Sequence, residues 1–299
     1  MDPHVVSVAP EVTFQVVVPE DSVEPNAVAM RRGEYPATLR PLITVLRAIA
    51  APGSKVLDLG GYLGGFALAA AALGYDVVVV EASEQNASCI RRSVAANAFV
   101  HPVRVLQAAV GATNGSVNFC AHGPWGHVET PNAADSSTGV VRQLTLPAVL
   151  HEVGWTEPDF IKMDVEGIEV RVLRSAASWF REGHRPTLLY EANGHTLDWF
   201  GDSPAALRAL VAGFGYVQYE VDEEGRLRQP NGFEPWCVMD YLASPKPLTG
   251  ALPARTLLQL AGRTMRALRA PSPPARKYAW KTLKSLFTGM ARKPDTMSF

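Results

Sequence analysis

Short apolar runs alternate with longer amphipathic stretches through the middle of the chain, and several of the runs end at an acidic residue. Such runs predict buried strands, and the stretches between them predict helices. The predicted strands cover residues 56–59, 76–81, 103–106, 115–120, 159–164 and 186–191, and the predicted helices cover 37–50, 66–73, 84–98, 168–180 and 203–213. Runs 216–221 and 236–242 predict a terminal hairpin. The pattern predicts an α/β fold with a doubly wound, mostly parallel, seven-stranded sheet of the Rossmann-like kind and an antiparallel edge hairpin.

A glycine-rich turn follows the first of these strands. Asp58 is followed by Gly60 and Gly64, in place of the G-x-G-x-x-G spacing with which helix amides meet a pyrophosphate. A carboxylate here would repel phosphate, so the spacing favours a cofactor with a cationic amino-acid end and no phosphate, which describes S-adenosylmethionine. Glu81 ends the next strand, where its carboxylate can accept both ribose hydroxyls. The alternative is an α/β domain with an ordinary glycine turn, since such loops are common.

The charge divides the chain into an acidic body and a basic C-terminal end. The net charge of the 299 residues is −1, but residues 251–299 hold ten Lys or Arg and one acid, Asp295. An acidic body is not expected to take nucleic acid as its main substrate. We expect an N-terminal preface at 1–34 with a strand at 12–18, a catalytic domain at 35–245, and a basic amphipathic helical tail at 246–299.

The cysteines and the N-terminal residues predict a cytoplasmic protein. Cys89, Cys120 and Cys237 are far apart and match no metal spacing, so we expect reduced thiols. The N-terminal residues lack the basic segment followed by an apolar one that is typical of a signal peptide. No stretch approaches the roughly 18 uninterrupted apolar residues of a membrane-spanning helix, so we expect neither feature. Helix 276–290 of the predicted tail has an apolar side and a lysine side. Residues 254–293 therefore fit peripheral contact with the inner membrane surface, or docking on the acidic body or a second subunit.

Two motifs carry a resemblance to a known family. Residues 58–64, DLGGYLG, and residues 160–169, FIKMDVEGIE, resemble the FkbM family of class I S-adenosylmethionine-dependent methyltransferases, over about residues 34–243. The chain differs from the first motif at Gly61 and Tyr62, where the family has alanine and asparagine. The cofactor-binding positions that the resemblance implies are Asp58, Gly60, Gly61 and Gly64 at the methionine end, Glu81 at the ribose, and Gln107 and Ala108 at the adenine edge.

Methyl transfer to a hydroxyl needs alignment of the reacting atoms and a group that removes the hydroxyl proton. Asp164, Glu166 and His195 follow the strands at 159–164 and 186–191, at the sheet edge where this fold places its site. His195 is the first candidate for the base, because its ordinary pKa is about 6.5; the alternative is a surface histidine in a turn. Lys162 shares a strand face with Asp164 and can pair with it. The catalytic candidates are His195, Asp164, Glu166 and Lys162.

A metal site is a second expectation at the same edge. Asp164, Glu191 and Asn193 are placed similarly to the oxygen ligands of Mg-dependent catechol O-methyltransferase, and oxygen ligands suit Mg²⁺. Residues 121–139 read as a loop in which His122 and His127 flank Trp125. One interpretation of this loop is a lid over the substrate. The alternative is that the two histidines are metal ligands, but no third ligand lies near them in the sequence.

The resemblance and the motifs together predict an O-methyltransferase. Its acceptor would be a hydroxyl of a carbohydrate, glycolipid or polyketide-type natural product. One rival is a non-catalytic module that keeps the cofactor pocket and recruits partners. The other is a nicotinamide-dependent oxidoreductase, which the missing G-x-G-x-x-G disfavours.

Overall fold

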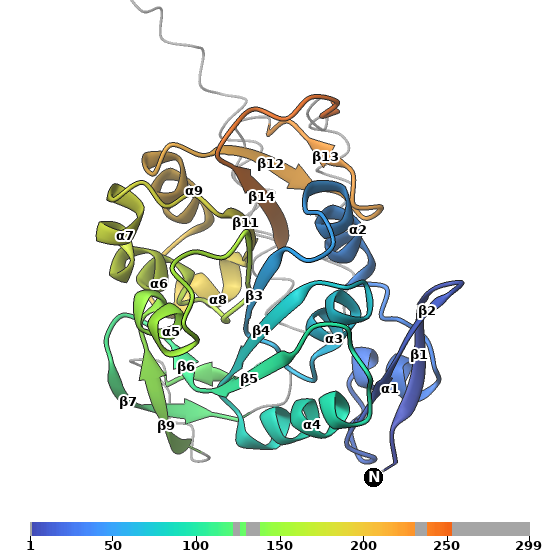
Figure 1. Ribbon diagram of the computed structural model, residues 1–299. Coiled ribbons are helices and arrows are strands. Elements are labelled where there is room, and N and C mark those ends of the chain that lie inside the picture. The colour runs from blue at the N-terminus through green and yellow to red at the C-terminus, as the bar shows by residue number, and fades with distance from the viewer. Residues whose placement is uncertain (1, 122–125, 130–137, 231–237, 253–299) are drawn as a thin grey trace, which may run out of the picture.

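An eight-stranded mixed sheet forms the centre of the molecule (Figure 1). The computed structural model describes residues 2–121, 126–129, 138–230 and 238–252. Across the sheet the order is β13 (Leu227–Arg228), β12 (Val217–Val221), β14 (Met239–Ser244), β11 (Thr187–Ala192), β10 (Phe160–Met163), β3 (Lys55–Leu59), β4 (Asp76–Glu81) and β5 (Val103–Gln107). The five strands from β11 to β5 are parallel, and β14 runs antiparallel to both β11 and β12.

The α/β class and the edge hairpin are as expected, but the count of seven strands is wrong. The eighth strand, β13, lies between the two runs that were predicted to form the terminal hairpin, and it pairs antiparallel with β12. Two residues are too few to show a period-2 pattern, so the sequence gives no sign of it. A second, four-stranded sheet was also not expected; its order is β6 (Ala109–Val110), β9 (Thr138–Leu144), β7 (Gly115–Cys120) and β8 (His127–Val128).

Helices cover both faces of the central sheet (Figure 1). One face carries α1 (Pro25–Arg31), α2 (Arg40–Ile49), α3 (Gly65–Ala72) and α4 (Glu84–Ala95), and the other carries α5 (Leu146–Glu152), α6 (Glu169–Ser175), α7 (Ala177–Arg181) and α9 (Pro204–Gly213). Alternate residues of β3 point to separate cores, since Val56 packs in the cluster that includes Phe66, whereas Leu57 packs in the cluster that includes Leu173. The strands therefore read as continuous apolar runs because both faces are buried.

The predicted helix 168–180 is in fact two short helices, α6 and α7, which meet at Ala176. The Ser175 hydroxyl donates to the carbonyl of Val172 at 2.7 Å, within the last turn of α6. Such a side-chain bond competes with the helical ladder and favours an end there.

The N-terminal residues form a hairpin, β1 (His4–Ala9) and β2 (Val12–Val16), that packs on α3 and α4. Asn97 joins it to the end of α4: its Oδ1 accepts from the amide of Gln15 at 2.8 Å, and its Nδ2 donates to the carbonyl of Gln15 at 2.7 Å. Val6 and Phe14 are buried in the same core as β3.

Parts of two expectations fall outside the described residues. The predicted tail helices lie at 253–299, and His122 and Trp125 of the predicted loop lie at 122–125. The described part of that loop contains β8 and the start of β9, so residues 127–128 and 138–139 are strand and not loop. In the part of the chain that the structure describes, no helix is long and apolar enough to cross a membrane.

Candidate cofactor and acceptor site

The glycine turn after β3 lies tightly against its neighbours. The amides of Gly60 and Gly61 both donate to the carbonyl of Val80 on β4, at 3.0 and 3.2 Å. Gly60 has φ +84°, and a Cβ built on it would lie 1.8 Å from the carbonyl oxygen of Asp164. The first glycine is thus required by the close packing of the β3 turn on the end of β10, in addition to any contact with a ligand.

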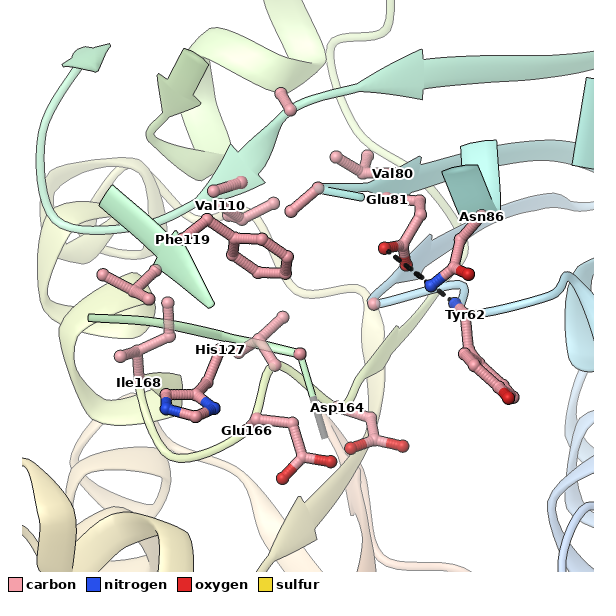
Figure 2. A pocket seen from close by; sticks show the side chains of 17 residues that line it. Tyr62, Val80, Glu81, Asn86, Val110, Phe119, His127, Asp164, Glu166 and Ile168 are labelled. Atoms are coloured by element: carbon pink, nitrogen blue, oxygen red, sulfur yellow. Dashed lines mark hydrogen bonds between the residues drawn. The ribbon is translucent and has the colours of Figure 1, made fainter. Parts of the chain in front are cut away.

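Glu81, at the end of β4, is fixed by three donors. Its Oε2 accepts from the amide of Tyr62 at 2.8 Å, and its Oε1 accepts from Nδ2 of Asn86 at 3.4 Å (Figure 2). The Oε1 atom also accepts from the amide of Ser83 at 2.8 Å. Burial raises the pKa of Glu81 to about 7, although these hydrogen bonds lower it. The carboxylate borders a cavity and keeps acceptor capacity for a pair of ligand hydroxyls.

A small cavity of about 80 Å³ adjoins Glu81. The apolar part of its wall is formed by Ala82, Ala108, Val110, Phe119 and Val128, with His127 from β8, and its polar part includes Glu81, Asn86, Asp164 and Glu166 (Figure 2). Ala108, for which the resemblance implies contact with the adenine edge, thus faces the cavity, and its role there stays a prediction. Gln107 does not line the cavity, and its Nε2 donates to the carbonyl of Ala82 at 3.0 Å, which braces the loop after β4.

Asp58 and Lys162 form a buried ion pair beneath the turn. The Nζ of Lys162 lies 3.1 Å from Oδ1 of Asp58, 3.1 Å from the carbonyl oxygen of Gly60 and 3.7 Å from Oδ2 of Asp164. Burial raises the pKa of Asp58, and Lys162 opposes that rise. Burial alone would lower the pKa of Lys162, but Asp58 and Asp164 raise it above its usual value. Lys162 pairs with Asp164, as the strand pattern predicted, yet Asp58 is the nearer partner.

A second cavity, of about 720 Å³, adjoins the first, since Gly60, Tyr62, Asp164 and Glu166 line both. This acidic cavity lies between the carboxyl ends of the strands and the segment from α1 to α2, and its volume is typical of ligand sites. Its charged lining residues are Glu24, Lys162, Asp164, Glu166, Glu191, Asp222, Glu223 and Asp240. Burial, followed by the nearby charges of Asp164 and Glu169, raises the pKa of Glu166 to about 9.

His195 and Asn193 are placed differently from these carboxylates. Both lie at the start of α8 (Gly194–Trp199), where Oδ1 of Asn193 accepts from the amide of His195 at 3.0 Å and caps the helix. The His195 ring packs edge-on against Trp199, with 4.8 Å between ring centroids, and His195 lines neither cavity. His195 as the base therefore stays a prediction.

The expected magnesium site is not assembled. Asp164 and Glu191 line the acidic cavity, but the side chain of Asn193 serves as the cap of α8. Within the described ranges, no group of three or more His, Cys, Asp or Glu side chains is arranged to hold a metal ion.

Sequence reasoning missed several wall residues. Asn86 and Phe119 lie on elements that were expected, but nothing in a helix or strand pattern shows which side chain will face a cavity. Tyr62 has φ 50°, which is rare for a residue other than glycine, and it brings its amide to Glu81. The sequence signal for this residue was that Tyr62 stands where the family motif has asparagine.

The chain matches the sequence model of a known domain family over more than half of its length. A sequence model of the methyltransferase FkbM domain matches residues 58–217. No curated protein matches the chain.

The solved structures that match the chain are distant in sequence, and their TM-scores are low. A SAM-dependent methyltransferase from Agrobacterium tumefaciens is 17% identical, with a TM-score of 0.44 over 82% of this chain and 71% of that chain. Precorrin-6y C5,15-methyltransferase from Geobacter metallireducens is 12% identical, with a TM-score of 0.41 over 77% and 94%. Magnesium protoporphyrin IX methyltransferase from Synechocystis, with bound SAM, is 11% identical, with a TM-score of 0.43 over 76% and 87%.

Proposed function

Because the chain belongs to the FkbM methyltransferase family, we propose that it transfers a methyl group from S-adenosylmethionine to a hydroxyl of a carbohydrate, glycolipid or polyketide-type product. The observation that carries this proposal is the buried carboxylate of Glu81, which is held by two backbone amides and borders a small, partly apolar cavity that adjoins the larger acidic cavity. This combination suits a nucleoside with a polar extension.

The residues present fit the cofactor. Glu81 would accept the ribose hydroxyls, and Ala108 with Phe119 would contact the adenine. Gly60 and Tyr62 line both cavities, so the methionine end can extend along the turn toward Asp164. When bound, the cofactor supplies an electrophilic methyl group on a sulfonium.

Asp164 is the better-placed candidate for the proton acceptor. It lines both cavities, and 35% of its side chain is exposed. The raised pKa of Glu166, about 9, means that this neighbour holds a proton near neutral pH and cannot take another. His195 is separated from the small cavity by Trp199 and His127, whose rings pack on each other at 4.8 Å.

Turnover with methyl-labelled S-adenosylmethionine and a panel of sugars and macrolides tests the proposal. We expect an O-linked label and release of S-adenosylhomocysteine. Asp164→Asn should lower kcat by about 100-fold or more, the range for loss of a general base, with little change in cofactor affinity. His195→Ala should retain most of the activity.

Two results would contradict parts of this account. If Asp164→Asn keeps normal turnover and His195→Ala does not, the assignment of the base is wrong. Tight cofactor binding without transfer to any acceptor would favour the non-catalytic module.

A further inference from the structure

The backbone of Tyr62 is fixed by hydrogen bonds within and beside the glycine turn. Its amide donates to Oε2 of Glu81 at 2.8 Å. The preceding residue, Gly61, donates its amide to the carbonyl of Val80, and its own carbonyl accepts from the amide of Gly64 at 2.8 Å. These bonds hold Tyr62 at φ 50°, in the left-handed region that residues with a side chain seldom adopt.

This conformation is unfavourable for a tyrosine. Glycine adopts the left-handed region freely, and asparagine adopts it more often than an aromatic residue does. The Tyr62 side chain is only partly buried, at the edge of the core that contains Phe66, so packing within the protein accounts for only part of its contribution. Strained residues of this kind cluster at ligand sites, where the surrounding structure holds them in place. A ligand that contacts the ring is therefore a reason for a tyrosine at this position.

Tyr62 also lies where the two cavities meet. In the part of the chain that the structure describes, the residues that line both cavities are Gly60, Tyr62, Asp164 and Glu166. Tyr62 is the one aromatic residue of this set. In Figure 2 its ring extends from the turn in the same direction as the Asp164 carboxylate, away from the apolar part of the small cavity's wall.

The far end of the ring lies near the N-terminal segment. Burial, followed by the charge of Glu24, raises the pKa of the Tyr62 phenol to about 12. Glu24 is itself held in place, because its Oε2 accepts from the amide of Ala27 at 3.0 Å and caps α1. A side chain that is placed in this way before a ligand arrives loses little freedom when the ligand binds.

The charged sulfur of the cofactor falls near this junction if Glu81 holds the ribose. In S-adenosylmethionine a single carbon atom separates the sulfur from the ribose ring, so the sulfur stays close to the carboxylate that accepts the ribose hydroxyls. The methionine chain would continue from the sulfur into the larger cavity, which Gly60 and Tyr62 also line.

An aromatic ring suits this sulfur better than the neighbouring carboxyl groups do. A sulfonium has no hydrogen to donate, whereas carboxylates bind most strongly to groups that donate hydrogen bonds. Cations without donors, such as quaternary ammonium groups, are recognised by the faces of aromatic rings. Asp164 is also partly balanced by Lys162, whose Nζ lies 3.7 Å from its Oδ2.

Resting on the cofactor site proposed above, we propose that the Tyr62 ring packs against the sulfonium of bound S-adenosylmethionine and favours this charged methyl donor relative to its neutral product. Methyl transfer removes the positive charge from the sulfur. S-adenosylhomocysteine therefore loses the cation–π contact with the ring and keeps the contacts at Glu81. Tyr62 is thus a specificity-determining residue that assists the exchange of product for fresh cofactor.

Calorimetric titration of the full chain with S-adenosylmethionine and S-adenosylhomocysteine tests this role, because the two ligands differ only at the sulfur. The variants are Tyr62→Phe, which keeps a ring, and Tyr62→Leu, which keeps an apolar side chain without one. Neither replacement is branched at Cβ, so the two are matched in their tolerance of the left-handed backbone. If Tyr62→Leu does not fold, Tyr62→Asn takes its place, since asparagine adopts this conformation more readily.

The readout is the ratio of the two dissociation constants, which a purely structural role would leave unchanged. Tyr62→Leu should weaken the binding of S-adenosylmethionine by about 5-fold to 30-fold, the range for a lost cation–π contact, and that of S-adenosylhomocysteine by about 2-fold or less. Tyr62→Phe should keep the ratio of the unmodified protein.

Three results would overturn the inference. They are parallel losses for the two ligands in Tyr62→Leu, no loss for S-adenosylmethionine, and a change of ratio in Tyr62→Phe as large as that in Tyr62→Leu. A change of ratio in Asp164→Asn that Tyr62→Leu does not show would overturn it as well, because the carboxylate would then bind the sulfonium.

The same titrations separate this inference from the proposed function. If the unmodified protein binds both ligands and Tyr62→Leu leaves the ratio unchanged, only the role of Tyr62 is contradicted. If the unmodified protein binds neither ligand, the methyltransferase proposal itself is contradicted.

Discussion

At the scale of single residues, the site depends on carboxylates whose roles are set by their partners more than by their positions in the sequence. Asp58 and Glu81 both come at the end of an apolar run, so the hydrophobic pattern gives no reason to assign them different roles. In the structure, Asp58 is fully buried against Lys162, whereas Glu81 is presented to a cavity by backbone amides. Strand patterns predict where the acids fall, but the partner that decides each role comes from another strand.

Lys162→Met should destabilise the protein strongly, because it leaves the carboxylate of Asp58 buried without its cation. Breaking a buried ion pair from one side costs about 3–5 kcal/mol of unfolding free energy. Urea unfolding measures this loss, and adding Asp58→Asn to Lys162→Met should restore part of the stability. A loss below about 1 kcal/mol for the single variant would show that the pair is not a structural requirement.

At the scale of elements, long periodic segments could be predicted and short ones could not. The helix at α4 and the strands β3, β4 and β10 fall within a few residues of their expected bounds, since each has a clear apolar period. The two-residue strands β6, β8 and β13 have no period to read. The four-stranded sheet is held by pairings such as β7 with β9, whose residues are distant in sequence.

Asn97→Ala should loosen the N-terminal hairpin from α4, because it removes both hydrogen bonds to the backbone of Gln15. We expect a loss of about 1–3 kcal/mol and faster hydrogen exchange in β1 and β2 than in β3. Asn118→Ala, at an exposed position, is the matched control. If hydrogen exchange in Asn97→Ala became faster by the same factor in all strands, the prediction that Asn97 acts locally on the hairpin would be wrong.

At the scale of the whole molecule, buried acids with a raised pKa make the free energy of unfolding fall as the pH rises. Carboxylates in ordinary ion pairs have the opposite effect. Burial raises the pKa of Glu169 to about 7, and burial with nearby charges raises that of Glu166 to about 9. Their ordinary value is 4.5, so the folded state binds protons more tightly than the unfolded state. The unfolding free energy should therefore be highest below about pH 4.5 as far as these groups are concerned, and fall as the pH rises to about 9.

Urea unfolding of the free protein at pH 5, 7 and 8.5 measures this slope. The raised pKa of Glu169 alone corresponds to a loss on the order of 3 kcal/mol of unfolding free energy as the pH rises from 4.5 to above about 7. The double variant Glu166→Gln and Glu169→Gln should flatten the profile. A stability that rises with pH over this range in the unmodified protein would contradict the assignment.

Cofactor binding at Glu81 is the central claim, and calorimetric titration with S-adenosylmethionine tests it most directly. The unmodified protein should bind near micromolar, and Glu81→Gln should bind about 10-fold to 100-fold more weakly, because a carboxylate that accepts ribose hydroxyls becomes an amide. Glu84→Gln, three residues along the chain and exposed, should bind normally. No binding to the unmodified protein, or equal binding by Glu81→Gln, would contradict the central claim.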